Sequence, residues 1–145
     1  MDEKYIIREA TPEDAEEIII FLNQVGKESD NLMHGKDGFH VPIEGVRRRL
    51  AMLSDSDNSI VIVAVINNKI IARAELDGYP NMRMHHRAKF SIAVKKDYLN
   101  KGIGTAMMNT ILKSAKTMQL KIIELEVLAD NFAGIALYKK MGFET

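Results

Sequence analysis

The chain has 145 residues, 46% of them hydrophobic, and its 20 basic and 20 acidic residues give a net charge of zero. This length predicts a single domain over residues 1–145 with its own hydrophobic core. The balanced charge does not indicate a nucleic-acid or membrane partner. The sequence has no cysteine, which excludes disulfides, thiolate metal sites and a cysteine nucleophile. It also has no apolar run of membrane-span length and no signal peptide, so we expect a cytoplasmic protein.

The first third of the chain predicts a short strand and two helices. The strand covers Tyr5–Arg8, and Thr11 and Pro12 are then typical of a helix N-terminus. The buried stripe of this helix is expected to hold Ala15, Ile18, Ile19, Leu22 and Val25. A long polar loop is expected over residues 26–41.

A second helix is predicted to begin at Pro42. Its inward residues are expected to be Val46, Leu50 and Leu53. Three consecutive arginines, Arg47, Arg48 and Arg49, are interpreted as part of its solvated face.

An antiparallel meander is predicted next. The apolar run Ile60–Ile66 favours a central strand, and Asn67–Lys69 favours a tight hairpin turn because asparagine tolerates positive φ. The returning strand is expected over Ile70–Leu76. After a turn at Asp77–Asn81, a third strand is expected over Met82–Val94.

The junction between this third strand and the next helix is the most informative stretch. Phe90–Val94 alternates with period 2, and from Ile103 the apolar residues follow helical spacing. Between them lies a glycine-rich turn formed by Asn100, Lys101, Gly102, Ile103, Gly104 and Thr105. Free backbone N–H groups and the positive end of the helix dipole make such a turn an anion site suited to phosphate. A P-loop is absent, and Met107 stands where a dinucleotide fingerprint needs its third glycine.

The last part of the chain predicts a parallel strand over Lys121–Leu128 and a short helix over Asn131–Met141. Gly142 and Phe143 are expected to start one more strand. The fold class is therefore α/β (α+β), with a mixed, mostly antiparallel central sheet flanked by helices in the order β-α-α-β-β-β-α-β-α-β.

Two motifs in this order resemble those of the GNAT superfamily of acyl-CoA-dependent N-acyltransferases. The family's phosphate motif, Arg/Gln-x-x-Gly-x-Gly/Ala, corresponds to Leu99–Gly104. Its later element, Asn-x-x-Ala-x-x-Leu-Tyr-x-x-x-Gly-Phe, corresponds to Asn131–Phe143. Together with the element order, the two motifs extend the resemblance over nearly the whole chain.

The chain departs from the family's pattern at several positions. Leu99 replaces the usual Arg or Gln, and Gly134 replaces the usual alanine. Lys89 stands where many members carry a glutamate that acts as, or positions, the general base. The family continues past Gly-Phe with a final strand pair, which this chain is expected to lack or truncate. A partner chain in a homodimer is one way to complete the sheet.

The resemblance implies acetyl-CoA as the cofactor. Its pantetheine arm would pair with the backbone between Phe90–Val94 and Ile123–Leu128, and a backbone N–H near Val94 would hold the oxyanion. The implied cofactor-binding residues are Ile92, Ala93, Val94, Asn100, Lys101, Gly102, Ile103, Gly104, Thr105, Asn131 and Tyr138. In the family this tyrosine is the usual acid for the departing thiolate, and a phenol is protonated at neutral pH.

The general base has several candidates. Glu75 and His86 are the preferred catalytic candidates beside Tyr138, and Glu126 and Asp77 remain open. Histidines stand at positions 34, 40, 85 and 86 without metal-ligand spacing, so no metal site is predicted.

These observations predict an N-acetyltransferase that moves an acetyl group from acetyl-CoA to a primary amine by direct attack. The acceptor would be a small amine or a protein N-terminus or lysine. Two alternatives stay open. One is a non-catalytic acyl-CoA-binding or regulatory domain, favoured by Lys89 and Leu99. The other is a nucleotide-binding module, favoured only by the glycine turn.

Overall fold

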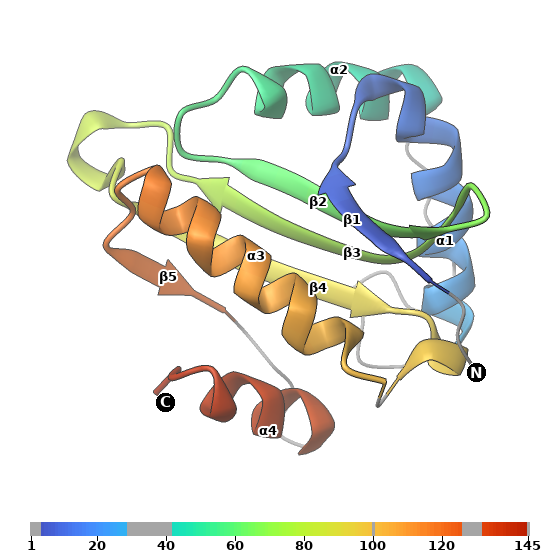
Figure 1. Cartoon of the computed structure of the whole chain (residues 1–145). Coiled ribbons are helices and arrows are strands. Elements are labelled where there is room, and N and C mark those ends of the chain that lie inside the picture. The colour runs from blue at the N-terminus through green and yellow to red at the C-terminus, as the bar shows by residue number, and fades with distance from the viewer. Residues whose placement is uncertain (1–3, 29–41, 100, 126–131, 145) are drawn as a thin grey trace.

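The computed structural model describes residues 4–28, 42–99, 101–125 and 132–144. Five strands form one sheet in the order β1-β2-β3-β4-β5 (Figure 1). The strands are β1 Ile6–Glu9, β2 Ile60–Ile66, β3 Lys69–Gly78, β4 Arg87–Val94 and β5 Ile122–Glu124. The helices are α1 Ala15–Glu28, α2 Ile43–Ser54, α3 Ile103–Thr117 and α4 Phe132–Lys140. Only the β4–β5 pairing is parallel within these residues, which confirms the predicted mixed sheet.

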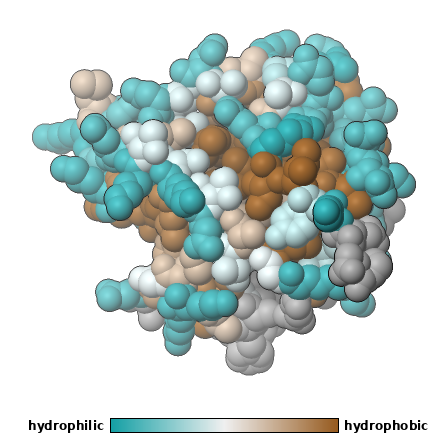
Figure 2. All heavy atoms as spheres, in the orientation of Figure 1, coloured by the Kyte–Doolittle hydropathy of each residue, from teal (hydrophilic) through white to brown (hydrophobic). Residues whose placement is uncertain are grey.

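The sheet separates two hydrophobic cores. Along β2, Val61 and Val63 pack with α1 and α2, whereas Ile62 and Ala64 pack with α3 on the other face. This follows from the period-2 alternation of a strand that is buried on both faces. Figure 2 views the α3 side, where hydrophobic residues gather in the centre with hydrophilic residues around them. Among the described residues, no helix has the length and apolar character that a membrane crossing needs.

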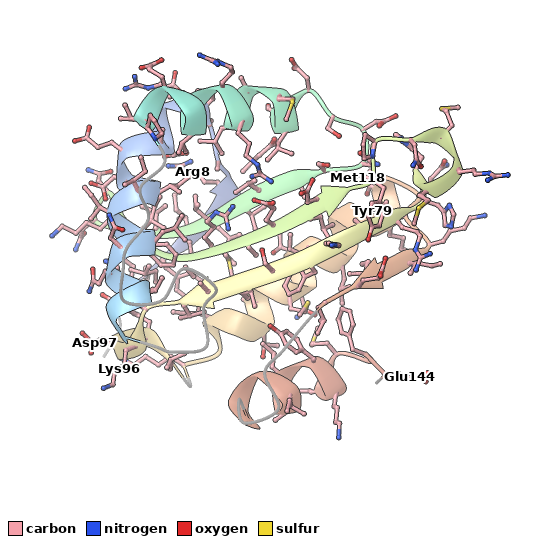
Figure 3. The ribbon with its side chains drawn as sticks, turned by 180° about the vertical axis from the view of Figure 1, so that it is seen from behind. Arg8, Tyr79, Lys96, Asp97, Met118 and Glu144 are labelled. Carbon is pink, nitrogen blue, oxygen red and sulfur yellow. The ribbon has the colours of Figure 1, made fainter. Side chains whose placement is uncertain are left out.

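The N-terminal end of the first helix differs slightly from the prediction. A 3-10 turn, η1 (Pro12–Asp14), precedes α1, and the Asp14 carboxylate accepts a 2.7 Å hydrogen bond from the Thr11 backbone N–H. The same carboxylate accepts two hydrogen bonds from the Arg8 guanidinium at 2.8 and 2.9 Å. Arg8 therefore ties β1 to the start of the first helix (Figure 3).

The predicted hairpin is present between β2 and β3. Asn67 and Asn68 have φ values of 51° and 65°. Positive φ at both central residues gives the turn a twist that matches that of the flanking strands. Asparagine adopts this conformation more easily than most other residues do, so the local sequence favours this turn.

The prediction that the third meander strand begins at Met82 is wrong, because β4 begins at Arg87. A 3-10 turn, η3 (Met82–Met84), occupies the first part of that range. The Asn81 side chain accepts a hydrogen bond from the Met84 backbone N–H at 2.9 Å, which favours a turn over a strand ladder. The buried Asn58 side chain also donates to the Tyr79 and His85 carbonyls at 3.0 and 3.2 Å.

The predicted strand at Gly142 and Phe143 is also wrong, since these residues close the C-terminal end of α4. Gly142 has φ of 98° and its N–H donates to the Lys139 carbonyl at 3.1 Å. The Phe143 N–H donates to the Tyr138 carbonyl at 2.9 Å. This pair of bonds is a Schellman motif, and a glycine suits its left-handed position.

The strand β5 is short in the described residues. Its three pairs with β4 are Arg87↔Ile122, Ala88↔Ile123 and Lys89↔Glu124. The rest of the predicted strand, residues 126–128, lies outside the described residues. The described residues resume at Phe132, where α4 begins. The predicted capping residue Asn131 therefore lies outside the described residues.

Candidate active site

The glycine turn lies at the start of α3. Gly102 is the N-cap and has a left-handed φ of 83°. A Cβ placed on Gly102 would have no atom within 4 Å, so this backbone faces open space. The Ile103 side chain is only 3% exposed and fixes the first helical turn against the core. The first-turn N–H groups of a helix have no intrahelical partner, so this exposed end can bind an anion.

Cations and an aromatic ring lie beside this turn. The Lys101 ammonium lies 5.6 Å from the centroid of the Tyr98 ring. Tyr98 belongs to η4 (Lys96–Tyr98), the 3-10 turn that joins β4 to the glycine turn. Asn100, a predicted cofactor contact, lies outside the described residues.

The helix α4 approaches the start of α3 closely. A Cβ on Gly104 would lie 3.4 Å from the Leu137 Cδ2 atom, which leaves little room for a larger residue. The next residue, Tyr138, packs against Phe90 of β4 with ring centroids 6.2 Å apart in an edge-on arrangement. The structure thus brings Tyr138 and β4 together. Burial raises the pKa of the Tyr138 hydroxyl, so the phenol is protonated at neutral pH.

The backbone groups of β4 alternate between its two neighbours. The Lys95 N–H donates to the Ile71 carbonyl of β3 at 2.9 Å, and the Arg87 carbonyl accepts from Tyr79 at 3.1 Å. Odd-numbered residues of β4 therefore direct their backbone groups toward β3. Even-numbered residues, including Ile92 and Val94, direct theirs toward the β5 side.

The pairing on the β5 side ends at Lys89 and Glu124 in the described residues. Within the described residues, no strand pairs with Ile92 and Val94 on that side, and an extended ligand can bond to N–H groups along such an edge. Ala93, the third predicted contact of this strand, directs its N–H toward β3 instead. Figure 1 shows β5 beside the first part of β4 only.

A charged network occupies the opposite face of the sheet. Glu75 of β3 is 7% exposed, and its carboxylate accepts hydrogen bonds from Arg49 of α2 at 2.9 and 2.7 Å. Arg73 also donates to this carboxylate. Arg49 reaches Asp77 as well, at 3.4 Å. The interpretation of Arg49 as part of a solvated face is therefore wrong, whereas Arg47 and Arg48 are exposed.

The network sets the ionisation of Glu75. Burial, the largest influence, acts to raise its pKa, but the hydrogen bonds and charges of Arg49 and Arg73 outweigh it. The pKa of Glu75 therefore lies below its ordinary value. A carboxylate held in this state is a good ion-pair partner and a weak base.

The other predicted base, His86, lies just before β4 begins. Its backbone carbonyl accepts from Lys121 and Ile122 at 2.8 and 3.2 Å, which joins the start of β5 to the sheet. At a rise of about 3.3 Å per residue, His86 is roughly 25 Å along the strand from Val94. The structure thus does not bring His86 next to the glycine turn. Glu126 and Asn131 lie outside the described residues.

Metal-binding groupings are absent from the described part of the chain, where no three histidine, aspartate or glutamate side chains could hold an ion together. The role of Arg49 was missed because its partners lie on a distant strand. The signal available in the sequence is weak: Arg49 directly precedes the inward Leu50 and lies three residues after the inward Val46.

The sequence profile described as the acetyltransferase (GNAT) family matches residues 29–143. The chain is 31% identical over 93 residues to the L-amino acid N-acetyltransferase AaaT of Escherichia coli K12, covering 63% of this chain and 57% of that protein. It is 39% identical over 54 residues to the [ribosomal protein bS18]-alanine N-acetyltransferase of the same strain, covering 37% of this chain and 36% of that protein. The matches thus span less than two thirds of either relative.

A solved structure extends the similarity to nearly the whole chain. The crystal structure of an acetyltransferase of the GNAT family from Streptococcus pneumoniae superposes with a TM-score of 0.93 at 31% identity. The match covers 97% of this chain and 85% of that one.

Proposed function

The chain belongs to the acetyltransferase (GNAT) family, and from this premise we propose that it transfers an acetyl group from acetyl-CoA to a primary amine. The observation that carries the proposal is the position of Tyr138 beside β4, whose pairing with β5 ends at Lys89 in the described residues. Acetyl-CoA supplies an activated thioester. The protein's own residues hold it, exclude competing reactions and manage the protons.

The glycine turn fits the pyrophosphate. Gly102 presents backbone without a side chain, and its left-handed φ directs the first turn of α3 outward. The helix dipole and the nearby Lys101 favour a negative charge there. Ile92 and Val94 offer backbone N–H groups to the pantetheine arm and to the thioester carbonyl oxygen.

The reaction uses the two faces of the sheet separately. The amine nitrogen forms a bond to the thioester carbon, and the carbon–sulfur bond breaks. Tyr138, on the α3 and α4 side, donates its hydroxyl proton to the departing sulfur, and the proton that the attacking nitrogen loses passes through solvent to restore the phenol. Glu75 lies on the α1 and α2 side, where it pairs with Arg49 of α2, and we place the acceptor on this side.

The acceptor amine must lose a proton before or during attack. Glu75 and His86 are the preferred candidates, but the lowered pKa of Glu75 and the roughly 25 Å along β4 between His86 and Val94 make each a weak choice. Glu75 fits better as a residue that orients the acceptor. Deprotonation by solvent before binding then supplies the neutral amine.

A turnover assay tests the proposal. Purified protein with acetyl-CoA and a panel of primary amines is expected to release free CoA and form acetylated amine. CoA, and not ATP, should compete with acetyl-CoA for binding. Acetyl-CoA binding without transfer to any amine would contradict the proposal and favour the non-catalytic alternative, which Lys89 and Leu99 suggest.

A further inference from the structure

The network around Glu75 contains one arginine, Arg49, whose side chain is partly exposed and can reach a ligand. We propose that Arg49 binds the carboxylate of the acceptor, so that the acceptor is a free amino acid rather than a peptide N-terminus or a simple amine. This inference rests on the proposed acetyl transfer and adds the class of acceptor to it.

The two guanidinium groups on Glu75 differ in exposure. The Arg73 side chain is 16% exposed, whereas the Arg49 side chain is 41% exposed. A buried guanidinium needs a carboxylate partner because it cannot be hydrated. Glu75 supplies that partner to Arg73. Arg49 is not needed to balance the charges of Arg73 and Glu75, so some of its N–H groups can donate to another anion.

The second contact of Arg49 is loose. Its Nη2 atom lies 3.4 Å from Asp77, whose side chain is 51% exposed. Charge-assisted hydrogen bonds are commonly about 2.7–2.9 Å long, so this pair is easily opened. The carboxylate of an acceptor can replace Asp77 at the Nη2 atom of Arg49, while Glu75 keeps its paired hydrogen bonds to the guanidinium. Asp77 is then solvated.

Glu75 and Arg73 lie on β3, the strand next to β4, and β4 is the strand that is proposed to hold the thioester. Glu75 is the register partner of Ser91 and Arg73 is the partner of Ala93 on β4. Ser91 is exposed, so the sheet is open to solvent on this face beside Glu75. Arg49 is therefore close to the place where an acceptor amine must stand, on the face away from Tyr138.

The local charge favours an acidic group on the acceptor. Arg49 and Arg73 pair with Glu75 and Asp77, and the Lys89 ammonium lies 6.0 Å from the centroid of the Tyr79 ring, so these five side chains together carry a formal surplus of one positive charge. Lys89 shares the face because it pairs with Asp77 in register. An acceptor with a second ammonium would find no surplus of negative charge here.

The test compares acceptors that differ only in the carboxylate. Each amino acid is assayed beside its carboxamide, for example leucine beside leucinamide, with wild type and with Arg49→Gln. The wild type is expected to prefer the amino acid. Arg49→Gln should lower kcat/KM for the amino acid about ten- to a hundredfold, the cost of losing a hydrogen bond between charged groups, with little change for the amide. The amine of an amino acid and that of its carboxamide differ in pKa. All assays therefore use one pH, and the preference of each variant for the amino acid is compared with that of wild type.

Two further variants make the test specific. Arg49→Lys keeps the charge but loses the planar fork, so it should recover part of the preference. Arg48→Gln removes an exposed arginine from the same helix and should leave the preference unchanged. Circular dichroism and acetyl-CoA binding check that each variant is folded.

The outcomes separate this inference from the proposed function. Equal transfer to amino acid and amide, better transfer to an N-terminal peptide, or an unchanged preference in Arg49→Gln overturns the role of Arg49 alone. Bound acetyl-CoA with no transfer to any acceptor overturns the proposed function and this inference together.

Discussion

The two faces of the sheet are built on different chemistry. The face under α3 and α4 is apolar and aromatic, and its polar groups include backbone N–H groups and the phenol of Tyr138. The face under α1 and α2 carries an apolar core and, beside it, the ion pairs of Arg49, Arg73 and Glu75. Backbone donors suit a ligand with a constant shape, whereas charged side chains suit one whose identity varies.

Because the two faces differ in this way, substitutions can change cofactor binding and the choice of acceptor independently. Substitutions in the charged network should alter which amine reacts and leave cofactor affinity unchanged. Substitutions at the glycine turn should do the reverse. The following predictions, from the largest expected effect to the smallest, test this separation.

Removing Glu75 should have the largest effect, and it should fall on stability. Glu75→Ala leaves the buried Arg73 without its partner, at an expected cost of about 3 kcal/mol in the free energy of unfolding. Urea denaturation measures this cost. The double variant Arg73→Leu with Glu75→Leu should recover most of it, because apolar residues can replace a buried ion pair. A single variant as stable as wild type would show that the pair contributes little.

The same pair predicts the response to acid. The pKa of Glu75 lies below its ordinary value of 4.5, so its contribution to stability is complete above that pH and is lost as pH falls through the lowered pKa. The free energy of unfolding should therefore decrease below about pH 4.5 in wild type. The decrease should be smaller in the double leucine variant. Parallel pH profiles would contradict this assignment.

On the other face, Tyr138→Phe should lower kcat roughly ten- to a thousandfold if the phenol protonates the departing sulfur. The variant keeps the ring that packs against Phe90, so acetyl-CoA affinity should hardly change. Loss of kcat without loss of binding marks an interaction made only in the transition state. Phe90→Leu serves as a packing control. An unchanged rate in Tyr138→Phe, with chemistry rate-limiting, would leave Tyr138 as a packing residue.

Gly102→Val should weaken CoA binding at least tenfold, or about 1.4 kcal/mol. The change adds a side chain where the phosphate is expected and strains a left-handed φ of 83°. Gly102→Asn separates the two causes, because asparagine tolerates this conformation. Calorimetry with both folded variants measures the effect. Wild-type affinity in Gly102→Val would exclude the turn as the phosphate site.

The smallest effect should come from salt. Lys95, Lys96 and Lys101 flank the turn, and Figure 3 labels Lys96 beside Asp97 in the segment that follows β4. CoA affinity should fall a few-fold as ionic strength rises toward about 0.5 M, since exposed charges are screened. Dephospho-CoA should bind more weakly than CoA if one lysine meets the 3′-phosphate. Equal affinities would exclude that contact.

The apolar face was largely predictable from the sequence, because its residues lie in two continuous motifs. Gly102 and Gly104 are one residue apart, and Tyr138 lies in a single helix with a recognisable spacing. Local sequence also predicted the hairpin at Asn67 and Asn68, where backbone conformation decides the structure.

The charged face was not predictable, because its contacts join distant positions. Arg49 and Glu75 are 26 residues apart, and only folding shows that a helical arginine meets a strand glutamate. The start of β4 was misplaced for a related reason. The side chain of Asn81 competes with strand pairing, which residue periodicity cannot reveal.

The short β4–β5 pairing has a consequence for amide hydrogen exchange. In the described residues no strand pairs with Ile92 and Val94 on the β5 side, so without a ligand their amides should exchange quickly, whereas the Ser91 and Ala93 amides, directed toward β3, should be protected. A cofactor arm bonded to that edge would slow exchange at every second residue only. This alternating protection would show that the cofactor is bound along β4 even when no acetyl transfer is detected. Cofactor binding can therefore be mapped before any acceptor is known.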